Sequence, residues 1–317
     1  MEMSFASIAA LLAAARSLVI TGHVHPDGDC LGSVLALYHG LVAAGKKVQM
    51  LIDDDIPAMY RFMPGVELIG KPADAKLVCD ALVVLDASDA ERIGKVGAAV
   101  EAPVINIDHH TSNVKFADYW LIDSQAAATG ELILRLFREM KTEITEDIAI
   151  CLYTAIATDC GFFKYANTSP STLRDAAYLM ECGAQPHLIA EQLDTRPLAT
   201  LTALGKVLQT LEFHAGGQIA TISVTREVGE YAQNTEGFIN YPRTVEGVEV
   251  AIMFKEAEDK NVRVSLRSKN IDVSSIALSF GGGGHMRAAG CTVTGSLKDA
   301  QAKVVTAVTE ALDRTPL

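Results

Sequence analysis

The sequence predicts a doubly wound α/β domain with a mainly parallel sheet, followed by a second, smaller α+β domain. In the first half of the chain, short apolar runs of strand length alternate with helical patterns, which is typical of a parallel sheet covered on both faces. The chain has 317 residues, and a single hydrophobic core has usually stopped growing at that length, so two domains are expected.

Four apolar runs in the first half are predicted as strands of the parallel sheet: residues 17–21, 47–52, 81–85 and 104–107. Helical patterns lie between and after them, at residues 31–44, 130–140, 146–157 and 171–181. Asp29 stands just before the first helix and is predicted as its N-cap, because an Asp side chain can accept the free backbone N–H groups there.

The pattern changes between residues 184 and 212, where helical segments follow one another without strands. We therefore predict a first domain over residues 1–188, a helical connector over 189–212 and a second domain over 213–317. In the second domain, strands are predicted at residues 218–224, 248–254, 262–266 and 291–293, with helices at 273–279 and 297–312. A run of glycines separates the shorter helix from the last strand.

Composition and charge exclude several classes of protein. A hydrophobic fraction of 49% is ordinary for a globular chain and rules out disorder. The apolar stretches reach about half of the roughly 20 residues that cross a bilayer, and the N-terminus lacks the basic segment of a secretory signal, so we expect a cytoplasmic protein. The six cysteines form no CxxC pair, which predicts buried free thiols. The net charge of −12 opposes binding of long duplex nucleic acid but permits a short anionic substrate.

The segment GHVHPDGDCLGS, residues 22–33, directly follows the first predicted strand. Ligands of open α/β sheets bind outside the carboxyl ends of the strands. His23, Asp27 and Asp29 lie within seven residues of one another, and imidazole combined with carboxylates suits Mn²⁺ or a similar divalent ion. The segment therefore predicts a metal site, with a plain polar turn as the alternative.

Two further strands bring acids and imidazoles to the same edge of the sheet. Asp86 follows residues 81–85, Asp108, His109 and His110 end or follow the run at 104–107, and Asp159 lies at the end of a predicted helix. The candidate metal ligands are His23, Asp27, Asp29, Asp86, His109 and Asp159. These six groups are too many for one ion once water and substrate are counted. The sequence thus predicts two divalent ions that share one carboxylate and activate a water.

The motifs resemble a known family. HVHPDGD at residues 23–29, the lone Asp86, the triplet at residues 108–110 and TDCGFF at residues 158–163 resemble, in order and spacing, the four motifs of the DHH phosphoesterases. In the second half, VSLRSKN at residues 264–270 and FGGGGHMRAAG at residues 280–290 resemble the DHH-associated C-terminal domain. The resemblance therefore covers the whole chain.

The resemblance implies a role for each of these residues. The implied ligand sets are His23, Asp27 and Asp86 for one ion, and Asp29, Asp86, His109 and Asp159 for the other. Asp86 would bridge the ions, and His110 would face the substrate phosphate. Asp108 is predicted from its place beside the histidines to orient one of them and not to bind a metal. Asp86, His110 and Asp108 are the predicted catalytic residues. His25 and residues 53–55 are predicted to lie outside the ligand set.

The second domain is predicted to bind the substrate. Glycines at residues 281–284 leave backbone N–H groups able to approach an anion, with a flexible turn as the alternative. Arg267 directly follows the strand predicted at residues 262–266, where a guanidinium can fork onto a phosphate. The predicted substrate-binding residues are Arg267, Ser268, Gly283, Gly284, His285 and Arg287.

The resemblance is to the bacterial nanoRNase group within this family. It implies hydrolysis of short oligoribonucleotides to mononucleotides, and removal of the 3′-phosphate from 3′-phosphoadenosine 5′-phosphate. It also implies two divalent ions, Mn²⁺ in the first place with Mg²⁺ or Co²⁺ as alternatives. The expected partners are short single-stranded RNA or a small nucleotide and a second copy of the chain, and neither long duplex nucleic acid nor a membrane.

Four alternatives stay open. A phosphodiesterase for cyclic or linear dinucleotides would use the same motifs. A family II inorganic pyrophosphatase shares the metal motifs, but the glycine-rich segment opposes it. A RecJ-type single-strand exonuclease would need a longer and more basic chain. A non-catalytic nucleotide-binding module would have lost metal ligands, whereas all six are present.

Overall fold

The chain divides between Thr195 and Arg196 into unit 1, Met1–Thr195, and unit 2, Arg196–Leu317. The computed structural model describes residues 1–231, 235 and 237–314, and of Glu230, Tyr231 and His285 it describes the backbone alone. The predicted connector spans this division, with α7 (Pro186–Asp194) in unit 1 and α8 (Leu198–Leu208) in unit 2. The division into a catalytic and a substrate-binding domain stays a prediction.

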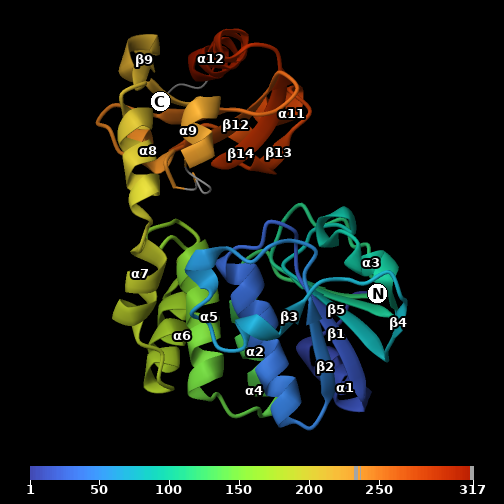
Figure 1. The fold of residues 1–317 in the computed structure, drawn as a ribbon. Helices are drawn as coiled ribbons and strands as arrows, with labels where there is room; N and C mark the ends of the chain where they lie inside the picture. The colour runs from blue at the N-terminus through green and yellow to red at the C-terminus, as the bar shows by residue number, and fades with distance from the viewer. Residues whose placement is uncertain (232–234, 236, 315–317) are drawn as a thin grey trace. The chain divides into compact units, whose positions relative to one another are not determined.

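A parallel sheet of six strands forms the centre of unit 1, in the order β3-β2-β1-β5-β7-β8 (Figure 1). Its strands are β1 (Ser17–Thr21), β2 (Lys47–Leu51), β3 (Ile69–Gly70), β5 (Ala81–Leu85), β7 (Val104–Asp108) and β8 (Tyr119–Ile122). The chain moves outward from β1 in one direction and from β5 in the other. This reversal confirms the doubly wound prediction. β3 and β8, at the two edges, were not predicted.

Helices and apolar cores lie on both faces of this sheet. The helices of the thicker layer are α1 (Phe5–Ala14), α2 (Gly28–Ala43), α4 (Thr129–Met140), α5 (Glu146–Asp159) and α6 (Pro170–Glu181). Their core includes Leu12, Leu35 and Phe137, all fully buried. A smaller core on the other face joins Val19 and Val84 of the sheet to Val96 of α3 (Val96–Ala99). A minor pair of strands, β4 (Leu77–Val78) and β6 (Val100–Glu101), lies beside it.

The start of α2 corrects one prediction. The helix begins at Gly28 and its N-cap is Asp27, whose side chain accepts the backbone N–H of Cys30 at 3.0 Å. The prediction of Asp29 as the N-cap was wrong, because the helix starts earlier and places Asp29 in its first turn with 1% of its surface exposed. The carboxylate of Asp29 is thus directed into the protein.

α2 packs closely against α5 because glycines face that helix. A Cβ on Gly28 would lie 2.3 Å from Thr158 Oγ1, and a Cβ on Gly32 would lie 2.4 Å from the carbonyl oxygen of Cys151. Neither position has room for a side chain. This packing brings the first turn of α2 beside the last turn of α5, where Asp159 ends the helix.

Unit 2 is built on a mixed sheet in the order β13-β14-β12-β11-β10-β9. Its strands are β9 (Glu212–His214), β10 (Ile219–Val224), β11 (Val250–Glu256), β12 (Asn261–Ser268), β13 (Gly283–His285) and β14 (Ala288–Thr294). β10 and β11 are parallel, and the other neighbours are antiparallel. The observed sheet confirms the predicted α+β class. β9 and β13 were not predicted.

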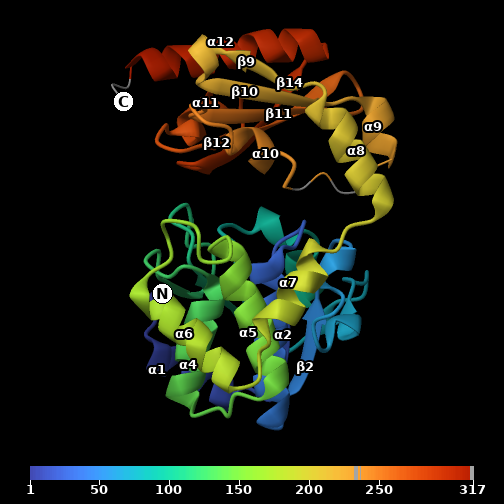
Figure 2. The ribbon, with the colours of Figure 1, turned by 90° about the vertical axis from the view of Figure 1, so that its left-hand side faces the viewer.

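The two faces of this sheet are covered differently. α12 (Leu297–Arg314) lies along one face of the sheet (Figure 2). Together with α11 (Val273–Ser279) it packs over Ile252, Val264 and Leu266. α8, α9 (Arg226–Tyr231) and α10 (Asn240–Arg243) lie on the other face. There the buried cluster includes Ile222 and Met253, which belong to β10 and β11.

Two expectations about the chain can be compared with the described residues. The six cysteines are free thiols, as predicted. Four of them are buried, but Cys79 and Cys182 are only partly buried, so the prediction of burial was wrong for these two. Among residues 1–231, 235 and 237–314, no helix combines the length and the apolar character that a membrane span requires.

Candidate metal centre

The predicted metal ligands of unit 1 meet at the carboxyl ends of β1, β5 and β7. β1 and β5 are neighbours at the point where the strand order reverses, and β7 follows β5 in the sheet. The loop after β1 carries His23, Asp86 follows β5, and His109 follows β7. The site therefore lies where an open α/β sheet ordinarily binds its ligand.

The first group of donors consists of His23, Asp27 and Asp86. The Nε2 atom of His23 lies 3.6 Å from Asp27 Oδ1 and 3.4 Å from Asp86 Oδ2. The three ligand atoms lie within 4.8 Å of one another, close enough to hold one metal ion. His23 is oriented by its other ring nitrogen, which lies 2.8 Å from the carbonyl oxygen of Val24.

The second group consists of Asp29, His109 and Asp159, and it can also hold one ion. The Nε2 atom of His109 lies 3.7 Å from Asp29 Oδ2 and 3.6 Å from Asp159 Oδ2. The same nitrogen lies 3.6 Å from Asp86 Oδ1. Asp86 thus presents Oδ2 to the first group and Oδ1 to the second, which is the geometry of a bridging carboxylate.

The backbone at Asp86 has a conformation that L-residues rarely adopt. Its φ angle is +56°, in the left-handed region, where a non-glycine residue is strained. The position is fixed by the backbone hydrogen bond from Asp86 N to the carbonyl of Ile107 and by the hydroxyl of Thr129, which donates to Oδ1 at 3.1 Å. The strained backbone of Asp86 thus lies at the residue whose carboxylate faces both donor groups.

Asp29 also stabilises the start of α4. The backbone N–H groups of Thr129 and Gly130 donate to its two carboxylate oxygens at 2.6 and 2.9 Å, and Ser33 donates to one of them at 3.1 Å. α4 has no side-chain cap from its own N-cap residue, Ala128. Asp29 therefore performs from α2 the task that a capping side chain performs locally.

Four carboxylates crowd this site, and their charges repel. Burial raises the pKa of Asp29 well above its ordinary value, and the charges of Asp86, Asp159 and Asp27 add to the rise. Burial likewise raises the pKa of Asp159 to about 7, with His109 opposing and Asp86 adding to the shift. Bound divalent cations would remove this repulsion. The donor set, oxygens with two imidazoles, fits hard or intermediate ions such as Mn²⁺.

His110 differs from His109 in its partner. Its Nδ1 atom lies 2.7 Å from Asp108 Oδ1 and 3.5 Å from Asp86 Oδ1. Burial opposes protonation of His110, but the hydrogen bond to Asp108 and the charge of Asp86 outweigh it and raise the pKa of His110. His110 also forms a third possible donor group with Asp86 and His109. The geometry alone therefore permits His110 as a ligand or as a cation facing the substrate.

Asp108 is fully buried, and its carboxylate accepts hydrogen bonds from three neighbouring residues. It accepts the backbone N–H of His109 at 2.8 Å, the imidazole of His110, and the amide of Asn113 at 2.6 Å. Burial would raise the pKa of Asp108, but its bond to His110 outweighs burial and lowers that pKa. These contacts are compatible with an orienting carboxylate, which stays a prediction.

Several supporting residues were missed by the sequence reasoning. Thr129 and Ser33 hold the carboxylates of Asp86 and Asp29, and Asn113 holds Asp108. Arg92 was also missed. Its carbonyl accepts the N–H of Val24 at 2.7 Å, and its charge lowers the pKa of His110, so it lies beside the site. No motif spacing marked these residues.

His25 and residues 53–55, which were predicted to lie outside the ligand set, have partners elsewhere. His25 is highly exposed, and its Nδ1 atom pairs with Asp54 Oδ2 at 2.7 Å. Asp53 accepts the backbone N–H of Lys95 at 2.8 Å and so fixes a loop. None of these residues belongs to the donor groups found among the described residues.

The glycine-rich segment of unit 2 is more ordered than a free anion-binding loop. The N–H groups of Gly281 and Gly282 donate to carbonyls of α11, so they are not available to an anion. Gly283 and Gly284 belong to β13, an edge strand of the sheet. A Cβ on Gly284 would lie 2.5 Å from the carbonyl of Ala288, which explains that glycine by strand packing. Nothing lies near a Cβ on Gly283, which is exposed.

The other predicted substrate-binding residues lie around the ends of β12 and β13. Arg267 is partly exposed near the end of β12, and Arg287 is exposed in the turn between β13 and β14. Ser268 is 2% exposed and its hydroxyl bonds the carbonyl of Ile271, so its side chain supports the following turn. The side chain of His285 lies outside the described residues.

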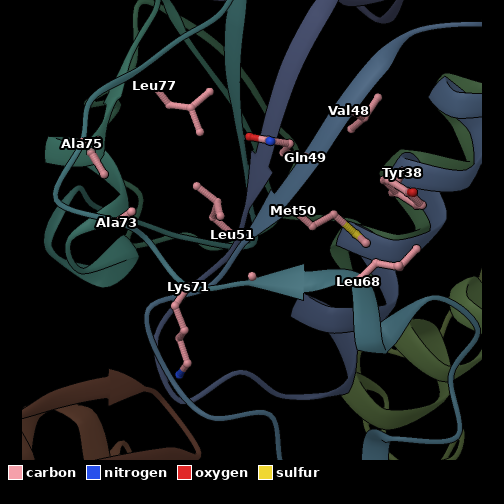
Figure 3. A pocket seen from close by; sticks show the side chains of 12 residues that line it. Tyr38, Val48, Gln49, Met50, Leu51, Leu68, Lys71, Ala73, Ala75 and Leu77 are labelled. Carbon is pink, nitrogen blue, oxygen red and sulfur yellow. The ribbon is translucent and has the colours of Figure 1, made fainter.

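A separate hollow of about 420 Å³ lies at the β2 and β3 edge of unit 1 (Figure 3). It is lined mainly by apolar side chains, among them Tyr38, Met50, Leu51 and Leu77. The charged side chain in its lining is Lys71, which pairs with Asp55 at 3.0 Å. The hollow is lined by residues other than those of the candidate metal centre, so it contributes nothing to that site.

Comparisons with known proteins agree with the motifs. A model of the DHH family, N-terminal domain, matches residues 17–156, and a model of the DHHA1 domain matches residues 202–313. A protein of Thermus thermophilus named bifunctional oligoribonuclease and PAP phosphatase NrnA is 38% identical, over 94% of this chain and 90% of its own length. The Bacillus subtilis protein of the same name is 25% identical, over 87% and 89%.

Solved structures show the same architecture. The crystal structure of an exopolyphosphatase-related protein from Bacteroides fragilis superposes with a TM-score of 0.87 at 27% identity, covering 98% of this chain and 95% of that one. A putative family II inorganic pyrophosphatase from Methanococcus jannaschii gives a TM-score of 0.52 at 17% identity, covering 93% and 99%. The second likeness concerns the fold alone.

Proposed function

This chain belongs to the DHH family of phosphoesterases and carries a DHHA1 domain, and from that premise we propose that it hydrolyses short oligoribonucleotides to mononucleotides. We further propose that it removes the 3′-phosphate of 3′-phosphoadenosine 5′-phosphate. The observation that carries the proposal is the shared carboxylate of Asp86, which faces one donor group through each oxygen. The names of the relatives in two bacterial species support the substrate class.

The proposed ligands are His23, Asp27 and Asp86 for one divalent ion, and Asp29, Asp86, His109 and Asp159 for the other. Mn²⁺ is the proposed ion, with Mg²⁺ or Co²⁺ as alternatives, because carboxylates and imidazoles in this ratio suit such ions. Two bound ions would lower the pKa of a shared water and balance the charge that develops on the phosphoryl oxygens.

The chain's own residues then have separate tasks. His110, held by Asp108, donates a hydrogen bond to a non-bridging phosphoryl oxygen, where negative charge grows in the transition state. Arg92 adds a second positive charge beside it. Thr129 and Ser33 keep the carboxylates of Asp86 and Asp29 in place, so that little reorganisation is needed during the reaction.

Unit 2 supplies the residues that are proposed to bind the nucleotide. Arg267 offers a planar guanidinium to a phosphate that is not cleaved, and Arg287 and the exposed Gly283 lie around the same strand ends. Residue His285 is proposed with them on the basis of its motif. Ser268 is proposed as a support of the turn through its bond to Ile271.

A hydrolysis panel tests this function. The substrates are a diribonucleotide, a pentaribonucleotide, 3′-phosphoadenosine 5′-phosphate, a cyclic dinucleotide and pyrophosphate, each with Mn²⁺, Mg²⁺ or EDTA. We expect the diribonucleotide, the pentaribonucleotide and 3′-phosphoadenosine 5′-phosphate to be cleaved with Mn²⁺ and none to be cleaved in EDTA. Rapid cleavage of pyrophosphate or of the cyclic dinucleotide alone would contradict the proposal.

A further inference from the structure

Two cations stand directly opposite each other on the sheet of unit 2. Lys255 of β11 is the register partner of Arg263 of β12, and Thr292 of β14 pairs with Arg263 on the other side. Like charges placed opposite each other across two strands destabilise a sheet. No ion pair joins Lys255 or Arg263 to a carboxylate in the part of the chain that the structure describes. The pair is therefore unfavourable for the fold by itself.

The partial burial of Lys255 increases the cost of this like-charge pair. Lys255 is partly buried, and its ammonium donates to the hydroxyl of Thr235 at 3.4 Å. Burial lowers the pKa of Lys255, and the charge of Arg263 lowers it further. The nearby carboxylate of Glu256 accepts the backbone N–H of Arg226 and so is already engaged. An anion bound between the two cations would relieve their repulsion.

The pair shares one open face of the sheet with Arg267. Side chains alternate along β12, so Arg263, Ser265 and Arg267 lie on the same face, opposite the core residues that α11 and α12 cover. On this face α8 to α10 bury Ala251 and Met253 of β11, whereas the three residues of β12 stay exposed or partly exposed. The face is therefore accessible to a ligand along β12 within unit 2.

The spacing along β12 sets the length of a ligand that could contact both Arg263 and Arg267. Arg263 and Arg267 are four residues apart, about 13 Å at the rise of an extended strand. This distance exceeds the step between neighbouring phosphates of a single strand. One mononucleotide cannot reach both positions, but a chain of several nucleotides can.

We propose that Lys255 and Arg263, together with the hydroxyl of Thr292, form a second phosphate site that binds an oligonucleotide beyond its first phosphodiester. The proposal rests on the proposed function, in which Arg267 holds the nearer phosphate. A phosphate fits the pair because it accepts hydrogen bonds from a guanidinium and from an ammonium at the same time. The site gives the enzyme a preference for RNA of several nucleotides over a dinucleotide.

The test compares two substrates in matched variants. Lys255→Met and Arg263→Gln keep most of the side-chain volume and remove the charges, and Lys303→Met on α12, on the other face, is the control. The double variant should show a kcat/KM about tenfold lower for a pentaribonucleotide and little changed for a diribonucleotide. For the pentamer, the slope of log kcat/KM against log salt is negative, and it should become less negative by about 0.7 for each phosphate that the variant no longer neutralises. The control should match the wild type on both substrates.

Stability and binding provide readouts that do not depend on hydrolysis. Lys255→Met should unfold at the same temperature as the wild type or at a higher one, because it removes a like-charge pair. Binding of a fluorescein-labelled pentaribonucleotide in EDTA, followed by anisotropy, should weaken about tenfold in the double variant. Equal losses on both substrates, or unchanged pentamer binding and turnover, would overturn the proposal. A wild type that binds the pentamer but cleaves no RNA would instead contradict the proposed function.

Discussion

The imidazole of His110 donates from Nδ1 to the carboxylate of Asp108, with 2.7 Å between the two atoms. Asp108 is fully buried and is itself fixed by Asn113 and by the backbone N–H of His109. The bond leaves Nε2 as the second N–H donor of a protonated His110. His109 instead directs Nε2 at three carboxylates. Two adjacent histidines thus have different surroundings and, by our proposal, different tasks.

Substitution of the two histidines should separate these tasks. His109→Ala should weaken metal binding, because it removes a donor from the second group. His110→Ala should leave the metal content nearly unchanged and slow turnover by a factor on the order of 10² to 10³, the effect of losing one preorganised transition-state donor. Metal analysis of the purified variants and steady-state kinetics measure both effects. Equal metal loss in the two variants would show that His110 is a ligand.

Removal of the bridging carboxylate should disturb both ions. Asp86 is the residue that faces both donor groups, so Asp86→Ala should lower the metal content below one ion per chain and reduce activity more than Asp27→Ala does. Metal content can be measured by atomic emission after gel filtration. Two retained ions with near-normal turnover would rule out the bridge.

Substitution of two of the carboxylates should change the stability of the metal-free protein in opposite directions. In EDTA, Asp159→Asn should raise the unfolding temperature, because it removes one charge from a repelling cluster in which Asp159 has its pKa raised to about 7. Asp29→Ala should lower the unfolding temperature, because two buried N–H groups of α4 lose their acceptor. The corresponding loss in the free energy of unfolding is about 1–3 kcal/mol. With Mn²⁺ both variants should be less stable than the wild type. Thermal unfolding with and without EDTA measures these signs; a stabilising effect of Asp29→Ala in EDTA would contradict the capping role.

The packing of α2 against α5 should be sensitive to any added side-chain volume at the glycines of α2. Gly32→Ala places a Cβ 2.4 Å from the carbonyl oxygen of Cys151, so the helices must separate at a cost of about 1–3 kcal/mol. The separation should also weaken metal binding, because it moves Asp159 away from Asp29. Gly205→Ala is the matched control: it lies in α8 with open space around it and should stabilise the protein by about 0.5–1 kcal/mol. Denaturant unfolding compares the two, and unchanged stability in Gly32→Ala would show that the helices pack more loosely.

The strands and the candidate metal ligands were predictable for one reason. Buried parallel strands are continuous apolar runs, and β1 and β5 were predicted residue for residue. The acids and imidazoles stand where such runs end, so finding the strands also located the candidate ligands. The helix start was missed because Asp27 and Asp29 are both good N-cap residues, and the sequence pattern does not decide between them.

The supporting contacts were not predictable because they join residues that are distant in the chain. Asp29 and Thr129 are 100 residues apart, and no local pattern relates a carboxylate on α2 to the start of α4. The glycine-rich segment shows a second limit. Its sequence suits both an anion site and an edge strand, and only the pairing of β13 with β14 reveals that Gly284 is required by packing.

The contribution of unit 2 is tested by comparing a nucleotide with a small ester. If Arg267 holds a phosphate that is not cleaved, its binding energy is available to a dinucleotide and unavailable to bis-p-nitrophenyl phosphate, which needs the metal centre alone. Arg267→Ala should therefore lower kcat/KM for a dinucleotide by roughly 10- to 100-fold, as expected for a charge-assisted hydrogen bond of about 1.5–3 kcal/mol, and should barely change the small ester. Metal content should stay at the wild-type level, and Lys303→Ala on α12 should affect neither substrate. An equal fractional loss on both substrates would mean that Arg267 supports the fold or the metal centre and does not bind the nucleotide.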